Sequence, residues 1–127
     1  MKHKFVPKRM KTFNGPVSPA VISGGFAFVS GQISTNPETG EIIKGNIKEE
    51  TKNALSNLKI IVEDMGCTLD DIVKCDVFLS TMKNFDEMNV VYKDFFGIDC
   101  PPARTCVANE LWGEMLIEIG AIVRVEK

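Results

Sequence analysis

The stretch from residue 116 to residue 125 constrains the fold more than any other part of the chain, because apolar residues occupy every second position in it. Its odd-numbered positions carry only isoleucine, alanine and valine, whereas the even-numbered ones include Glu118, Gly120 and Arg124. Successive side chains of a β-strand point to opposite faces of the sheet. The pattern therefore predicts a strand with one wholly apolar face and one mixed face.

A second strand is predicted just before it, at residues 103–108. A turn near Trp112 would join the two strands as an antiparallel hairpin, with Cys106 opposite Glu118 and Arg104 as a diagonal neighbour. A charge in apolar surroundings is costly unless something pairs with it. Arg104 and Glu118 are therefore either a structural ion pair or part of a functional site, and Cys106 is either a small buried hydrophobe or a member of that site.

Two helices are predicted between the early and the late strands. The first is signalled by Asn46 as N-cap, with Glu49 three residues later as in a capping box, and by Gly66 at its end. The second starts at Asn84 and carries an apolar stripe at helical spacing up to about residue 96. Both stripes are typical of helices packed against a sheet.

Further strands complete the predicted domain. Ser23-Gly24-Gly25 separates two apolar runs and predicts a hairpin whose glycines take positive φ angles, and residues 73–79 read as another strand. Two helices can cover only one face of a sheet of about six strands. We therefore predict a single α+β domain over residues 1–127, with a mixed sheet and two helices packed on one face.

The opposite face of this sheet is expected to be uncovered within the chain. On the hairpin register it would carry Arg104, Cys106, Glu118 and Ile122. An exposed sheet face of that size with apolar members indicates association with another surface. The sequence therefore predicts a homo-oligomer with the charged residues at or near its interface.

Composition excludes several classes of protein. The chain has 44% hydrophobic residues and a formal net charge of −2, and it contains neither a run of 18 apolar residues nor the apolar stretch of a signal peptide. We expect a soluble, cytoplasmic protein with no membrane partner. The spacing of its four cysteines matches no zinc motif, and His3 is the only histidine, so we expect no metal site.

Basic residues are concentrated at the N-terminus, where residues 1–13 form either a basic arm or an edge strand. The residues concerned are Lys2, Lys4, Lys8, Arg9 and Lys11. Such an arm can contact nucleic acid. Because no nucleic-acid-reading motif is present, we expect no nucleic-acid partner.

Several segments together resemble the RidA family, also called YjgF, of reactive-intermediate imine deaminases. They are Asn14-Gly15-Pro16, Val29-Ser30-Gly31-Gln32-Ile33, the predicted second helix with Asn89 and Tyr92, Pro102-Ala103-Arg104-Thr105-Cys106-Val107, and Ile117-Glu118-Ile119. The resemblance covers nearly the whole chain. It implies a chorismate-mutase-like α+β fold assembled as a homotrimer with clefts between subunits.

The resemblance also implies a reaction, the cofactor-independent hydrolytic deamination of 2-imino and enamine acids. Substrates such as 2-iminobutanoate and 2-iminopropanoate would yield 2-oxo acids and ammonia, a form of metabolite damage control. Arg104 corresponds to the arginine that grips the substrate carboxylate, and Glu118 to the glutamate that positions the hydrolytic water. The implied substrate-binding positions are Ser30, Gly31, Asn89, Arg104 and Cys106.

Four positions depart from the family pattern. The sequence has Val17 in place of a tyrosine, Pro19 in place of a glutamine, an altered loop around Trp112, and Gly120 in place of a second glutamate.

The alternative function is a non-catalytic regulatory module that holds a small 2-oxo or related carboxylic acid in the same cleft. The glutamate favours the enzyme, because holding a ligand requires only the arginine. A third reading, RNA cleavage, is disfavoured by the acidic body of the chain and by the lack of a histidine pair.

Overall fold

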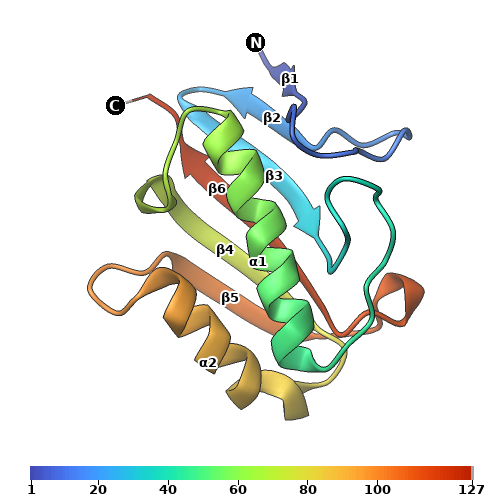
Figure 1. Cartoon of the computed structure of the whole chain (residues 1–127). Helices are drawn as coiled ribbons and strands as arrows, with labels where there is room; N and C mark the ends of the chain where they lie inside the picture. Colours follow the sequence, from blue (N-terminus) through green and yellow to red (C-terminus); the bar gives the residue numbers. More distant parts are fainter. Residues whose placement is uncertain (127) are drawn as a thin grey trace.

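The computed structural model describes residues 1–126 and shows one six-stranded sheet with two helices on one of its faces (Figure 1). The strands are β1 (His3–Phe5), β2 (Ala20–Ser23), β3 (Phe26–Gln32), β4 (Ile72–Leu79), β5 (Ala103–Ala108) and β6 (Ile117–Arg124), and the helices are α1 (Ile47–Asp64) and α2 (Phe85–Phe96). The strand order is β1-β2-β3-β6-β4-β5, and only the β4–β5 pair is parallel. The predicted α+β architecture with a mixed sheet is confirmed.

The predicted hairpin between β5 and β6 is wrong, because β4 lies between these two strands. β5 runs parallel to β4 and places Arg104 opposite Cys75, whereas β6 runs antiparallel to β4 and places Glu118 opposite Phe78. β6 occupies the middle of the sheet, where its apolar face is fully buried beneath α1. The alternation of apolar and polar residues correctly predicted which side chains of β6 share a face. It did not predict the neighbouring strands, which depend on how the apolar face is buried.

The same pairing corrects the prediction that four site residues share the uncovered face. Residues opposite one another on adjacent strands point to the same side of a sheet. Arg104 therefore lies on the helix side with the buried Cys75, and Cys106 lies there too, opposite the buried Val77. Glu118 remains on the uncovered side, and so does Ile122. The exposed aromatic side chains of Phe26 and Phe28 also lie on the uncovered side.

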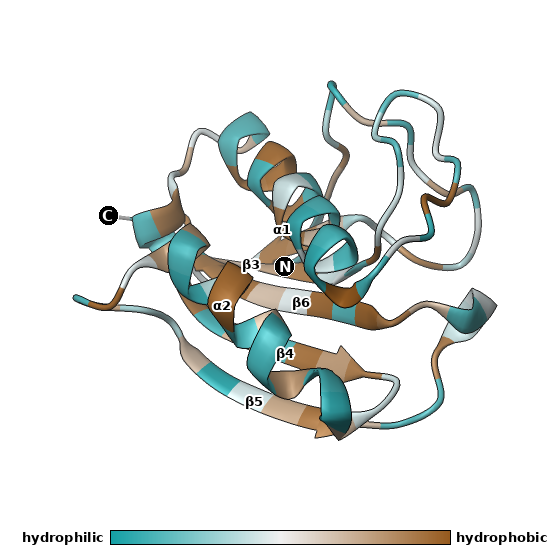
Figure 2. Ribbon diagram, turned by 60° about the horizontal axis from the view of Figure 1, so that its bottom comes forward, coloured by the Kyte–Doolittle hydropathy of each residue, from teal (hydrophilic) through white to brown (hydrophobic). Residues whose placement is uncertain are grey.

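Helix α1 begins and packs as its sequence predicts. Asn46 Oδ1 accepts a hydrogen bond from the Glu49 amide at 2.9 Å, and the Asn46 amide donates to Glu49 Oε1 at 3.3 Å. Figure 2 shows that each helix carries both hydrophobic (brown) and hydrophilic (teal) residues. The fully buried apolar residues of α1 are Ala54, Leu55, Leu58, Ile61 and Val62. Each of the larger side chains contributes roughly 1.5–3 kcal/mol by leaving water.

The predicted glycine turn between β2 and β3 is also confirmed. Gly24 and Gly25 have φ angles of 61° and 84°, and β2 pairs antiparallel with β3 on either side of them. Both residues lie in the left-handed region that glycine enters without steric cost. Within residues 1–126, neither helix is long and apolar enough to cross a membrane.

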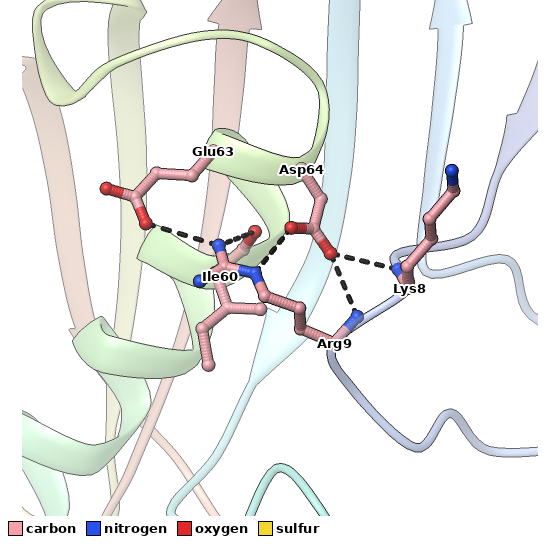
Figure 3. Close-up of polar contacts among 5 residues, drawn as sticks. All are labelled: Lys8, Arg9, Ile60, Glu63 and Asp64. Carbon is pink, nitrogen blue, oxygen red and sulfur yellow. Dashed lines mark hydrogen bonds and ion pairs between the residues drawn. The ribbon is translucent and has the colours of Figure 1, made fainter.

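The N-terminal segment is anchored to the end of α1 by one arginine (Figure 3). Arg9 Nε donates to Asp64 Oδ1 at 2.7 Å, and Arg9 Nη2 donates to Glu63 Oε1 at 3.2 Å and to the Ile60 carbonyl at 3.4 Å. The amides of Lys8 and Arg9 both donate to Asp64 Oδ2, at 2.9 and 3.0 Å. Part of the predicted basic arm is therefore held against α1.

This anchor makes stability depend on pH in the acid range. The Arg9 amide, together with its guanidinium, holds the pKa of Asp64 below the ordinary value of 3.8. A carboxylate with a lowered folded-state pKa stabilises the fold above its ordinary pKa, and this contribution is lost as the pH falls through the folded-state value. We expect Asp64→Asn to melt a few degrees below wild type at pH 7.

The difference in melting temperature should shrink as the pH falls below about 3.8, because protonated Asp64 loses the same interactions that asparagine lacks. Thermal unfolding followed by circular dichroism between pH 7 and pH 3 checks this expectation. Asp70→Asn, which changes an acidic residue outside the anchor, is the control. A gap that stays constant over this range would contradict the role of the Asp64 charge.

Candidate functional site

Strand β3 is interrupted by a bulge where it passes β6, and a cavity opens there. The register between the two strands shifts between Val29 and Gln32, which places Ser30 and Gly31 at the irregularity. A Cβ atom added to Gly31 would collide with the carboxylate of Glu118. Glycine is therefore required for the close approach of this side chain to the bulge. All three residues, Ser30, Gly31 and Glu118, line a cavity of about 560 Å³.

Glu118 is the polar centre of this cavity. Its side chain is half-buried, and it accepts no hydrogen bond from any residue between 1 and 126. A carboxylate has about four acceptor positions, so those of Glu118 are available to a water molecule or to a ligand. A half-buried acceptor of this kind is suited to holding a water against a bound molecule.

Ser30 is held by the chain segment that precedes β2. Its hydroxyl donates to the Ser18 carbonyl at 2.6 Å, and its amide donates to the Pro19 carbonyl at 3.0 Å. These two bonds fix residues 18–19 beside the bulge. They also bring Val17, which is 47% exposed, to the wall of the cavity.

Arg104 lies elsewhere, between β5 and α2, in a firmly oriented position. Its Nη1 donates to Asn89 Oδ1 at 2.7 Å. The guanidinium carbon stands 4.7 Å from the centroid of the Tyr92 ring and 5.4 Å from that of Phe85. Cation–π contacts and a single hydrogen bond orient the group and leave donors of the guanidinium for a ligand.

Burial controls the acid–base state of the groups around Arg104. Burial raises the pKa of the Cys106 thiol, and the positive charge of Arg104 only partly offsets this. Burial also raises the pKa of Cys75 to about 11 and that of Tyr92 above its ordinary value. All three groups are therefore neutral at pH 7, and Cys106 provides a thiol and not a nucleophilic thiolate.

The predicted site residues thus fall into two groups within one chain. Arg104, Asn89 and Cys106 lie on the helix side, on the edge strand β5 and the adjoining α2. Ser30, Gly31 and Glu118 lie around the cavity at the β3 bulge. The structure brings the members of each group together, but it does not bring the two groups together.

Sequence reasoning missed the polar residues of α1 that hold the cavity walls. Glu50 is only 2% exposed, and its carboxylate accepts hydrogen bonds from the Leu116 amide at 2.9 Å and the Gly45 amide at 3.3 Å. Asn57 donates to the carbonyls of Ile33 and Thr35, both at 3.1 Å. A signal was present, because Glu50 lies four residues before Ala54 on the buried stripe of α1, where a charge needs partners.

Comparison with known proteins places the chain in a family. The family model described as Endoribonuclease L-PSP matches residues 8–125. A RutC family protein of Pyrococcus abyssi is 47% identical over 113 residues, which are 88% of each chain. A 2-iminobutanoate/2-iminopropanoate deaminase of Dermatophagoides farinae is 37% identical over 88% of each chain.

The fold agrees with these sequence matches. The crystal structure of a Thermotoga maritima protein, described as a putative endoribonuclease, superposes with a TM-score of 0.91 at 44% identity, with full coverage of both chains. The sequence matches therefore span most of the domain, and the fold match spans all of it. The chain belongs to the RidA (YjgF) family, whose model carries the description Endoribonuclease L-PSP.

Proposed function

We propose that the protein hydrolyses 2-imino acids and their enamine tautomers to 2-oxo acids and ammonia. The observation that carries this proposal is the half-buried carboxylate of Glu118, which lines a cavity and accepts no hydrogen bond within residues 1–126. Such a carboxylate can orient a water molecule and take its proton as the water attacks. Relatives named 2-iminobutanoate/2-iminopropanoate deaminases support the same reaction.

In this proposal, Arg104 binds the carboxylate of the substrate. A guanidinium is a planar fork that donates two parallel hydrogen bonds to a carboxylate. Asn89 and the two aromatic rings hold the fork in place before a ligand arrives. Fixing the carboxylate of the substrate also fixes the adjacent C=N carbon against the water, which lowers the entropic cost of the attack.

The reaction then needs one water molecule and proton transfers only. The water oxygen adds to the carbon of the protonated imine (C=NH2⁺) while Glu118 accepts a proton from the water, and the nitrogen becomes a neutral amine. Return of a proton to this nitrogen lets the C–N bond of the carbinolamine break. Ammonia leaves, and the hydroxyl group loses its proton to become the carbonyl of the 2-oxo acid. The neutral thiol of Cys106 lies beside Arg104 and takes no part as a nucleophile.

A complete site needs two copies of the chain, because Arg104 and Glu118 of one copy lie on opposite faces of the sheet. In this proposal, the β5 edge of one copy lies against the β3 bulge of the next. The exposed aromatic rings on the uncovered face offer apolar contact area for that association. Head-to-tail contacts of one kind close into a ring, and we propose a homotrimer with three intersubunit clefts.

Mixing two inactive variants tests this arrangement. Arg104→Ala keeps Glu118, and Glu118→Gln keeps Arg104, so a site formed between one chain of each kind can be intact. Random assembly of equal amounts of co-expressed chains should restore about one quarter of the wild-type activity. A mixture as inactive as its parents, or a protein that sediments as a monomer at micromolar concentration, would contradict a shared site.

Coupling to a threonine dehydratase tests the reaction itself. The dehydratase releases the imine of 2-oxobutanoate, and the proposed activity should accelerate the appearance of the 2-oxo acid and of ammonia. Arg104→Ala is the control for contaminating activities. No acceleration by folded protein, together with binding of 2-oxobutanoate, would instead indicate the regulatory binding module. Cleavage of RNA by nuclease-free protein would support the endoribonuclease description of the family.

Asn89 should act as a positioning residue for Arg104. Asn89→Ala removes a hydrogen bond to a charged group, and we expect KM to rise about 10-fold with a smaller change in kcat. Asn84→Ala is the matched control, because Asn84 lies at the start of α2 and its side chain makes no capping hydrogen bond. Equal KM values for the Asn89 variant and wild type would contradict this role.

A further inference from the structure

The residues that line the cavity beside Glu118 are of two chemical kinds. The polar ones include Ser30, Gln32 and Glu118, and the proposed hydrolysis takes place beside Glu118. The apolar ones include Met10, Phe13, Val17, Ile33, Ile42 and Trp112. The segments that carry these apolar residues precede β2, follow β3 and precede β6 (Figure 1).

Two of the apolar lining side chains are aromatic and largely exposed. Trp112 is 72% exposed and Phe13 is 76% exposed, and both line the same cavity. A single exposed aromatic residue needs no explanation. Two exposed aromatic residues beside exposed aliphatic ones, around one concave site with a polar floor, are typical of a surface that binds an apolar group of a ligand.

The segments that carry these side chains are anchored by hydrogen bonds. The loop with Trp112 is held by the buried Glu50, which binds the Leu116 amide, and by an ion pair of 3.3 Å between Lys44 and Glu114. The Lys11 amide donates to the Pro37 carbonyl at 2.7 Å. The backbone segments that carry Trp112 and Phe13 are therefore each held by hydrogen bonds to other parts of the chain.

In a single chain, before a second copy adds its Arg104 to the proposed site, the cavity is larger than a small imino acid. Cavities of about 300–1000 Å³ enclose ligands of drug size, and this one measures about 560 Å³. With its reacting carbon near Glu118, a substrate with a methyl or ethyl side chain would leave the aromatic surface in contact with water. A larger apolar side chain would reach Trp112 and Phe13 and remove both surfaces from water.

Resting on the proposed function, we infer that the preferred substrates are 2-imino acids with large apolar or aromatic side chains. The substrate side chain lies against the aromatic surface of Trp112 and Phe13 while the C=N carbon lies beside Glu118. Differences of one methylene in an apolar pocket change catalytic efficiency by about 10- to 200-fold. The loops around the cavity then determine which substrate side chain binds. Glu118 at the bulge and Arg104 determine the reaction that the bound substrate undergoes.

A comparison of imines made in place tests this inference. D-amino acid oxidase produces the imines of D-alanine, D-leucine and D-phenylalanine, whose C2 is planar and carries no configuration. Semicarbazide traps each imine, and hydrolysis by the protein slows formation of the semicarbazone. We expect kcat/KM for the leucine and phenylalanine imines to exceed that for the alanine imine by at least ~10-fold.

Two variants locate the effect in the cavity. Trp112→Ala should lower the ratio of phenylalanine-imine to alanine-imine efficiency by at least ~5-fold, and Phe13→Ala should lower it in the same direction. Ile98→Ala is the matched control, because Ile98 is 71% exposed and does not line the cavity, so this variant should keep both activity and ratio. Sedimentation of each variant checks that its assembly equals that of wild type.

Some results would overturn only this inference, and others would overturn the proposed function as well. Hydrolysis of all imines at equal efficiency, or a Trp112 variant that loses every activity by the same factor, would overturn this inference and leave the proposed function standing. A Trp112 variant that changes the oligomeric state would also overturn it, because the surface would then be a contact between copies. Hydrolysis of none of the imines would overturn the proposed function and this inference with it.

Discussion

Arg104→Ala is expected to lower kcat/KM for imine hydrolysis roughly 100- to 1000-fold, because it removes both hydrogen bonds to the substrate carboxylate. Losing one partner of a hydrogen-bonded charge pair costs about 3–4 kcal/mol when the remaining charge stays desolvated. The fold should be retained, since the guanidinium makes one hydrogen bond, to Asn89, within residues 1–126. Single-turnover kinetics and thermal unfolding of the same preparation separate activity from stability.

Arg104→Lys sharpens this prediction. Lysine keeps the positive charge but is a point donor, and it cannot reproduce the planar two-bond grip or the stacking between Phe85 and Tyr92. We expect the lysine variant to be nearly as inactive as the alanine variant. Lys93→Ala, which removes an exposed cation from α2, is the control and should keep its activity. Wild-type rates in Arg104→Lys would show that charge alone binds the substrate.

Glu118→Gln is expected to lower kcat by roughly 100- to 10,000-fold, the usual contribution of a general base. Glutamine has nearly the same shape and can still hold a water, but it cannot take its proton. Binding of 2-oxobutanoate should change little, because Arg104 carries that interaction. Steady-state kinetics and calorimetric titration with the 2-oxo acid measure the two quantities separately.

The control for this variant is Glu110→Gln, which alters an exposed carboxylate outside the cavity that contains Glu118. It should retain wild-type kcat. Unchanged turnover in Glu118→Gln would mean that another group activates the water. Weakened binding with unchanged kcat would instead make Glu118 a binding residue.

Local patterns predicted the elements of the fold well because each pattern reflects a local requirement. The Asn46–Glu49 capping box marks the start of α1 since unpaired amides at a helix N-terminus need acceptors nearby. The glycine pair before β3 marks the turn since few other residues tolerate its backbone angles. Alternation in β6 marks its buried face since one side of that strand lies under α1.

Strand neighbours could not be read in this way. The hairpin prediction assumed that consecutive strands pair. In the structure, α2 connects β4 to β5, and β5 pairs with β4 as a parallel strand. This register places Arg104 opposite Cys75, on the helix side of the sheet. The alternation of apolar and polar residues in β5 and β6 is the same whether the two strands pair directly or have β4 between them. Pairing depends on which arrangement buries the most apolar surface, and that is a property of the whole chain.

The candidate site also has parts that local sequence patterns predict and parts that they do not. Arg104 and Glu118 could be selected from the sequence because charges in apolar strands need an explanation. The residues of the cavity walls could not be selected in this way, because Phe13, Ile42 and Trp112 come from three separate loops. Their meeting depends on contacts such as those of Glu50 and Asn57, which act over distances of many residues along the chain.

The anchoring of residues 8–13 has a consequence for how this domain can change over evolutionary time. The bonds that hold this segment come from the Arg9 side chain and from the amides of Lys8, Arg9 and Lys11. Phe13 also lines the cavity, but its side chain makes none of these bonds and is largely exposed. Substitutions of Phe13 that change the cavity can therefore accumulate without weakening the attachment of the segment, and an engineer can randomise this position while the anchor stays intact.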